Sequence, residues 1–260
     1  MITIYTVVTN DYCDVNLDQD YLPNVNYVCF SDKPIDLPKP WETRLLKNPD
    51  NLHPTRLSRL PKIKSHMFFE PWEKTIYVDA QCCLNIQAVT EALRLLDSRD
   101  IVNHLHPTRD SYVDEMLFMY FNGLITAEEI FDKTEELVEE GYNFYDHVCV
   151  LNSFVARINT PYTRDFEKLW WEEYLKFECY AMRDQLPWAI SLTKSRAKDK
   201  HCFFVKDLLT TLPERQSIYK KTTAHPKFRP DRYDLARVQS ILIALTNQPM
   251  INGLILSKPL

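Results

Sequence analysis

The chain has 260 residues, enough to bury one sizeable core, and its 45% hydrophobic and 26% charged residues are typical of a globular domain. Its three glycines exclude the glycine-rich loops that bind dinucleotides in Rossmann dehydrogenases or phosphates in P-loop NTPases. The 31 Lys and Arg residues against 36 Asp and Glu residues give a net charge of -5, which disfavours extended binding to duplex nucleic acid.

Three segments in the first third of the chain have the pattern of buried strands that end in polar residues. They are residues 2–9, 26–32 and 75–79, each rich in β-branched or aromatic side chains. The prolines between the second and third segments predict an irregular connection. After it, residues 56–69 have helical spacing that Pro61 starts or interrupts. This alternation of strands and helices predicts an α/β fold.

The later part of the chain continues the alternation. The patterns predict helices over residues 86–96, 126–141, 163–180 and 183–192, and strands over 100–104, 148–158 and 201–205. Thr126 and Glu129 have capping-box spacing, and Gly141 is placed to end that helix. We expect a single domain over 1–260, with its core over about 1–210. Residues 211–260 form a tail that is rich in proline and basic residues and contains a helix that docks on the core.

Polar residues at the carboxyl ends of strands are the first candidates for ligand binding in such sheets, and Asp32 and Asp79 qualify. Asp79-Ala80-Gln81 stands where enzymes that use nucleotide-activated sugars place an Asp-x-Asp motif, whose carboxylates hold a divalent cation on the diphosphate. Because Gln81 replaces the second carboxylate, a metal would be held with less charge or replaced in part by basic side chains. An ordinary strand-end residue is the alternative for Asp79.

Basic side chains accompany these carboxylates. Arg59 and Lys62 lie three residues apart on a predicted helix, so they share one face and can reach a diphosphate. A solvated basic face is the alternative. His225, in the tail, is a candidate metal ligand or phosphate contact, with a surface histidine as the alternative.

Two further carboxylates stand beside clustered ionisable groups. Glu115 follows Arg109 and neighbouring histidines, and is a candidate for binding acceptor hydroxyls unless it only caps a helix. Asp184 follows Arg183 at a predicted helix start, where it suits a general base or a stabiliser of positive charge on an anomeric carbon. A helix N-cap is the alternative for Asp184.

Five short motifs between residues 26 and 193 occur in an order that resembles one known family, the TOD/MUCI-type glycosyltransferase-like domain. The motifs are Asn26-Tyr27-Val28-Cys29-Phe30-Ser31-Asp32; Arg59-x-x-Lys62-x-Lys64-x-His66 with Phe69; Tyr77-Val78-Asp79-Ala80-Gln81; His106-x-x-Arg109 with Tyr112 to Glu115; and Arg183-Asp184-Gln185-Leu186. The resemblance implies a GT-A-like fold, a Rossmann-type α/β sandwich with a mixed, mostly parallel sheet flanked by helices. A nucleotide-sugar lies across the strand ends of that fold. Pro61 departs from the family, and we expect it to break the helix that carries Arg59.

Together the residues and the resemblance predict a glycosyltransferase that moves a sugar from a nucleoside diphosphate to a hydroxyl acceptor. The expected roles are Thr9, Asn10 and Asp32 near base and ribose; Arg59, Lys62, Gln81 and Arg183 in donor binding; Asp79 and His225 at a manganese or magnesium ion; and Glu115 and Asp184 flanking the reacting carbon. A glycan, a lipid-linked sugar or a hydroxymethylated DNA base would be the acceptor. Two alternatives stay open: a metal-dependent amide hydrolase of the ceramidase type, and a non-catalytic sugar-binding domain.

The expected location is the cytoplasm. Seven cysteines without a C-x-x-C pair predict reduced thiols rather than a disulfide framework. The sequence has no apolar run of membrane-spanning length and lacks the anchor of the plant family members. We therefore expect a soluble chain of bacterial or viral origin.

Overall fold

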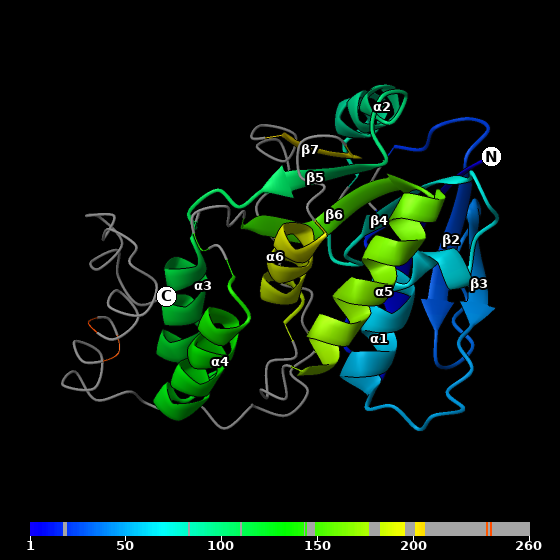
Figure 1. The fold of residues 1–260 in the computed structure, drawn as a ribbon. Helices are drawn as coiled ribbons and strands as arrows, with labels where there is room; N and C mark the ends of the chain where they lie inside the picture. The colour runs from blue at the N-terminus through cyan, green and yellow to red at the C-terminus, as the bar shows by residue number, and fades with distance from the viewer. Residues whose placement is uncertain are drawn as a thin grey trace.

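The computed structural model describes residues 1–17, 20–82, 84–109, 111–142, 144, 149–176, 183–195 and 201–205, with Val238 and Ser240. These residues form a seven-stranded sheet in the order β3-β2-β1-β4-β6-β5-β7 (Figure 1). The strands are β1 (Ile2–Val8), β2 (Asn26–Ser31), β3 (Trp41–Leu45), β4 (Lys74–Val78), β5 (Ile101–Leu105), β6 (Val150–Ile158) and β7 (Cys202–Val205). All neighbouring strands are parallel except where β6 pairs with β4 and β5.

Six α-helices and one short 3-10 helix accompany the sheet in the described part of the chain. They are α1 (Pro54–Ile63), η1 (Ser65–Met67), α2 (Ile86–Leu95), α3 (Tyr112–Phe121), α4 (Ala127–Glu139), α5 (Pro161–Lys176) and α6 (Gln185–Lys194). The capping box of Thr126 and Glu129 opens α4 as predicted, and Gly141 follows its end with a φ of 71°.

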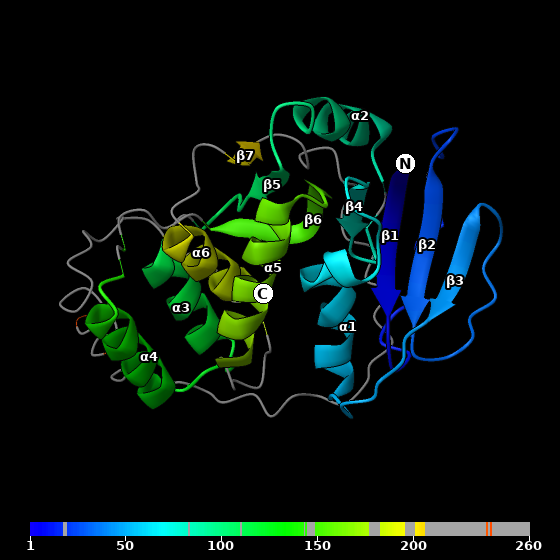
Figure 2. The same cartoon turned by 45° about the vertical axis from the view of Figure 1, so that its right-hand side comes forward.

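Alternation along the strands builds a core on each face of the sheet. Ile4 and Ile76 pack with α2 on one face, whereas Tyr5 and Tyr77, one residue further along each strand, pack with α1, α5 and α6 on the other. Figures 1 and 2 show α1, α5 and α6 as neighbours on that second face. The predicted α/β sandwich, with a mixed, mostly parallel sheet between helices, is therefore confirmed.

A third core lies at the side of the sheet away from β3, where both views place α3 and α4 (Figures 1 and 2). Leu186 and Ile190 of α6 belong to this core, while Trp188 and Leu192 of the same helix belong to the core under the sheet. Val238, from the predicted docking helix, is helical and buried in the third core. The rest of the tail from residue 206 onward, except Ser240, lies outside the described residues.

Two local predictions were wrong, and one helix was not predicted. The proline-rich connection contains an additional edge strand, β3, because Pro40 precedes the strand and leaves its ladder intact. A helix, α3, occupies residues for which the sequence analysis predicted no helix or strand. Pro61 does not break its helix: α1 runs through it to Ile63, and the carbonyl of Pro61 accepts a hydrogen bond of 3.0 Å from the buried Tyr5 hydroxyl.

Candidate functional site

Four charged side chains meet at the carboxyl end of β4, and we call them the ion cluster: Arg59, Lys62, Asp79 and Asp184. The ammonium of Lys62 lies 2.6 Å from Asp184 Oδ2 and 3.6 Å from Asp79 Oδ1. Arg59 Nε lies 3.8 Å from the same oxygen of Asp184. The structure thus joins residues more than 100 positions apart in the sequence and connects Asp79 to Asp184 through one cation.

Helix α1 supplies both basic members of the cluster. Their spacing of three residues places them on one helical face, as predicted, and both reach Asp184. The side chain of Lys62 is 3% exposed and that of Arg59 is 27% exposed, so the face is not simply a solvated one. Lys62 is fixed inside the protein, and Arg59 is accessible to a ligand.

Asp184 precedes α6 at the N-cap position but makes no capping hydrogen bond with its side chain. Its carbonyl instead accepts hydrogen bonds from Asn152 Nδ2 at 3.1 Å and Trp170 Nε1 at 3.0 Å. Burial alone would raise the pKa of Asp184, but Lys62 and Arg59 outweigh it and lower the pKa below its usual range. Asp184 is therefore a buried, ionised carboxylate. Its backbone carbonyl, at the start of α6, is held by Asn152 and Trp170.

Asp79 follows β4 directly and keeps 27% of its side chain exposed. Its Oδ1 accepts a hydrogen bond of 2.6 Å from the Tyr77 hydroxyl, and its backbone N–H donates to Ser153 O at 2.9 Å. Burial, and then the charge of Asp79, raise the pKa of Tyr77, so that hydroxyl keeps its proton and remains a donor. Asp79 is not turned into the interior: it is anchored on one oxygen and reaches the surface.

A second charged group adjoins Asp184 through its chain neighbour Arg183. Glu115 is 0% exposed; its Oε2 lies 2.6 Å from Arg109 Nε, and its Oε1 lies 3.4 Å from Arg183 Nε. Both guanidinium groups also lie over the ring of Phe118. The buried Glu115 thus holds both arginines, and its predicted place beside a reacting carbon stays a prediction. Arg183, 25% exposed, is the accessible member.

The predicted nucleoside residues lie at the carboxyl ends of β1 and β2. Asn10 and Asp11 both have left-handed φ values, 53° and 51°, and Asp32 Oδ2 accepts a hydrogen bond of 2.8 Å from the backbone N–H of Asn10. Thr9 is buried, and its hydroxyl donates to Pro54 O at 3.0 Å. Asn10 and Asp32 present exposed side chains here, while Thr9 ties this loop to the start of α1.

The two remaining candidates are Gln81 and His225. Gln81 is half-buried in the turn after Asp79, where Cys82 N donates to Asp79 O at 2.9 Å. His225 lies outside the described residues, so its predicted place at a metal stays a prediction. Among the residues that the structure describes, no three or more His, Cys, Asp or Glu side chains form a group that could hold a metal ion.

The surroundings of Asp79 suit an ammonium better than a divalent cation. Lys62 Nζ stands between Asp79 and Asp184, and a metal ion that used both carboxylates would meet that fixed positive charge. The Tyr77 hydroxyl also donates to Asp79 Oδ1, the same oxygen that Lys62 faces. The donor set around Asp79 therefore does not fit the manganese or magnesium ion that the sequence predicts.

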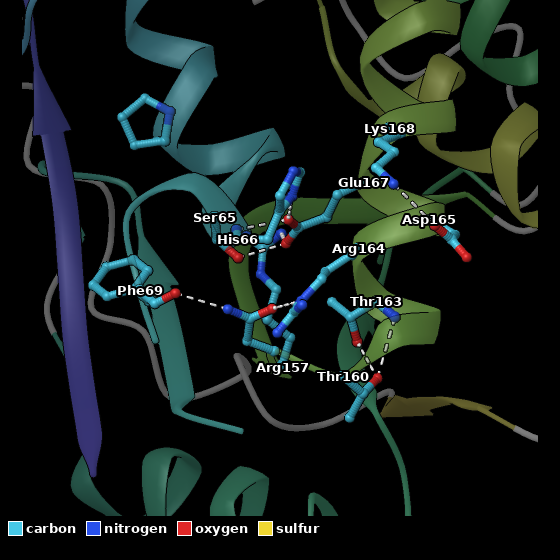
Figure 3. Close-up of polar contacts among 12 residues, drawn as sticks. Ser65, His66, Phe69, Arg157, Thr160, Thr163, Arg164, Asp165, Glu167 and Lys168 are labelled. Carbon is cyan, nitrogen blue, oxygen red and sulfur yellow. Dashed lines mark hydrogen bonds and ion pairs between the residues drawn. The ribbon is translucent and has the colours of Figure 1, made fainter. Parts of the chain in front are cut away.

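A buried network behind the ion cluster fixes the backbone of Lys62. Arg157 Nη2 donates to Lys62 O at 2.5 Å, and its Nη1 lies 2.8 Å from Glu167 Oε1. Glu167 also accepts hydrogen bonds from Ser65 Oγ at 2.5 Å and from the backbone N–H of His66 at 2.9 Å (Figure 3). The network joins β6 and α5 to the segment after α1, so it sets where α1 ends.

Sequence reasoning missed Tyr77, Asn152 and Arg157 as supports of this site. Tyr77 and Asp79 lie two residues apart, so strand alternation puts them on one face, and that spacing could have revealed the contact. Asn152 and Arg157 interrupt an apolar strand pattern with polar side chains, which is the signal of a buried hydrogen-bonding role.

Comparison with known proteins adds little to this geometry. No protein-family model matches the sequence, and no curated protein matches it. Among solved structures, the apo form of mouse xyloside xylosyltransferase 1 is similar with a TM-score of 0.39 and 8% sequence identity, over 79% of this chain and 84% of that chain. In the described part of this chain, no helix has the length and apolar character needed to cross a membrane.

Proposed function

We propose that the protein is a glycosyltransferase that uses a nucleoside-diphosphate sugar, with the TOD/MUCI-type domain as its family and a GT-A-like fold. The observation that carries the proposal is the ion cluster. It brings together the basic helix, the Asp79 motif and the Arg-Asp-Gln motif, which are far apart in the sequence. They meet at the carboxyl end of the strands, where α/β proteins bind ligands.

The charges of the site suit a diphosphate leaving group. Negative charge develops on that group as the sugar departs, and positioned cations that meet it stabilise the transition state. Arg59 and Arg183 are the accessible cations, and a guanidinium can contact two phosphate oxygens at once. Asn10 and Asp32 would contact the base and ribose from the ends of β1 and β2.

Asp184 has an electrostatic role in this proposal. Its lowered pKa makes it a weak acceptor of a proton at neutral pH, whereas its ionised form stabilises positive charge on the anomeric carbon. Glu115 has an indirect role in this proposal, because it holds Arg183 in place for contact with the diphosphate. The proposal leaves the acceptor as predicted: a glycan, a lipid-linked sugar or a hydroxymethylated DNA base.

Titration with UDP-, GDP- and CDP-sugars by calorimetry tests the proposal. We expect one class to bind and Arg59→Ala to weaken its binding by about tenfold or more, the loss of a charge-assisted contact. The matched control is Arg94→Ala, which removes an exposed arginine paired with Glu91 on α2. Absence of binding by every donor, or equal losses in both variants, would contradict the proposal.

Turnover assays separate the two alternatives. Release of fatty acid from ceramide would favour an amide hydrolase. Donor binding without hydrolysis or transfer over a broad acceptor panel would favour a non-catalytic sugar-binding domain.

A further inference from the structure

We propose that the ammonium of Lys62 takes the place of a divalent cation, so that the site binds a diphosphate with its own side chains and without a metal ion. The inference rests on the proposed function for the nucleoside part of the ligand. The anion site itself follows from the side chains of the ion cluster and of its neighbour Arg183.

The geometry of Lys62 is that of an internal counter-ion. Its Nζ lies within ion-pair distance of both Asp79, the predicted metal ligand, and Asp184. The same atom lies 4.8 Å from the centre of the Tyr77 ring, and the Tyr77 hydroxyl donates to Asp79. With its backbone held by Arg157 and its side chain 3% exposed, Lys62 has little freedom to leave this position.

The charge balance already favours an anion. The ion cluster and its neighbours hold four cations, Arg59, Lys62, Arg109 and Arg183, against three carboxylates, Asp79, Glu115 and Asp184. Four minus three leaves one net positive charge among these seven side chains. Because Asp184 and Glu115 are buried with their partners, the exposed parts of Arg59 and Arg183 can face the phosphates.

A first experiment compares anion binding with and without metal in the intact protein. Calorimetric titrations of UDP, GDP, CDP and inorganic pyrophosphate are made in excess EDTA and again in manganese. We expect the bound anion to have the same dissociation constant in both solutions. A loss of affinity in EDTA of about tenfold or more, equal to about 1.4 kcal/mol, would overturn the inference.

The same titrations separate failure of the inference from failure of the proposed function. Binding of a nucleoside diphosphate only with manganese overturns the inference and keeps the glycosyltransferase proposal. Binding of pyrophosphate in EDTA, without any nucleoside diphosphate, keeps the anion site and removes the proposed donor. No binding of any of the four anions overturns both.

A second experiment removes the internal cation and has a readout other than activity. In Lys62→Met the two carboxylates lose their shared ammonium, so manganese should bind them and raise the thermal midpoint with increasing concentration. Manganese should leave the midpoints of the wild type and of the Lys62→Met, Asp184→Asn double variant unchanged. A manganese response in the wild type, or none in a folded Lys62→Met, would overturn the inference. If Lys62→Met does not fold, the wild-type arms decide.

Discussion

Asp184 and Lys62 form a buried ion pair, and such pairs are costly to break from one side. Taking both charges out of water costs free energy that their attraction offsets only while both partners are present. The exposed fractions of the two side chains are 5% and 3%, so water does little to replace a missing partner. The pair is therefore costly to break, although it contributes little net stability while both partners are present.

We predict that Asp184→Asn lowers the free energy of unfolding at neutral pH by about 3–5 kcal/mol, because the buried Lys62 then loses its nearer carboxylate, at 2.6 Å, and keeps only Asp79 at 3.6 Å. The folded-state pKa of Asp184 is lowered, so its contribution is complete above the unfolded pKa of about 3.9 and is lost as the pH falls through the folded value. Urea denaturation at a series of pH values should show the two proteins converging below about pH 4. A difference that stays constant down to acid pH would contradict the assignment.

The charged residues of the site were more predictable than their supports. Arg59 and Lys62 could be selected because they share a helical face, and Asp79 and Asp184 because they stand at a strand end and a helix start. The internal pairing of Lys62 could not, because it depends on how closely α1 and α6 pack on the same face of the sheet. That arrangement is set by packing between residues distant in the sequence.

At the scale of elements, one carboxylate connects three of them. Glu167 of α5 is itself 0% exposed, and it binds Arg157 of β6 and the segment that follows α1. Asp165, two residues earlier on the same helix, forms an exposed pair with Lys168 (Figure 3). The two acidic residues are therefore a natural comparison of a buried and a solvated charge.

We predict that Glu167→Gln lowers the free energy of unfolding by about 3–5 kcal/mol, because it leaves the buried guanidinium of Arg157 without its counter-ion. The control, Asp165→Asn, should change it by no more than about 0.5 kcal/mol. Urea denaturation of both variants measures the difference. If both substitutions lowered the free energy of unfolding equally, the buried network would stabilise the fold no more than an exposed ion pair does.

The sequence pattern predicts buried elements well and edge elements poorly. The strands that became β1, β2 and β4 are central and nearly continuous in apolar residues, so their pattern was plain. By contrast, β3 is an edge strand with one buried residue, preceded by prolines. Helix α3 is apolar on all sides apart from its first turn and therefore lacks the stripe that marks an amphipathic helix.

At the scale of the whole molecule, the cores shelter most of the described thiols. Cys13, Cys29, Cys149 and Cys202 are buried, whereas Cys82 is half-buried in the turn after β4. Burial raises the pKa of Cys13 to about 11 and those of Cys29 and Cys202 to about 12, and it raises that of Cys149 further. Since the thiolate is the reactive form, these four should be inert in the native state.

We predict that brief iodoacetamide treatment of the native protein at neutral pH modifies Cys82 first among these five cysteines. The four buried thiols should react only after denaturation, because little thiolate forms at a raised pKa and the reagent lacks access. Peptide mapping by mass spectrometry distinguishes the sites. Modification of Cys29 or Cys149 at the rate of Cys82 would mean that the cores open readily.

Helix α6 has one row of side chains in the core beneath the sheet and another in the core of α3 and α4. A helix is stiff along its axis, so α6 moves as one body. A displacement of α3 and α4 must therefore either disrupt the packing of one of these rows or shift the amino end of α6 as well. The distance between Asp184 and Lys62 is therefore sensitive to the position of α3 and α4.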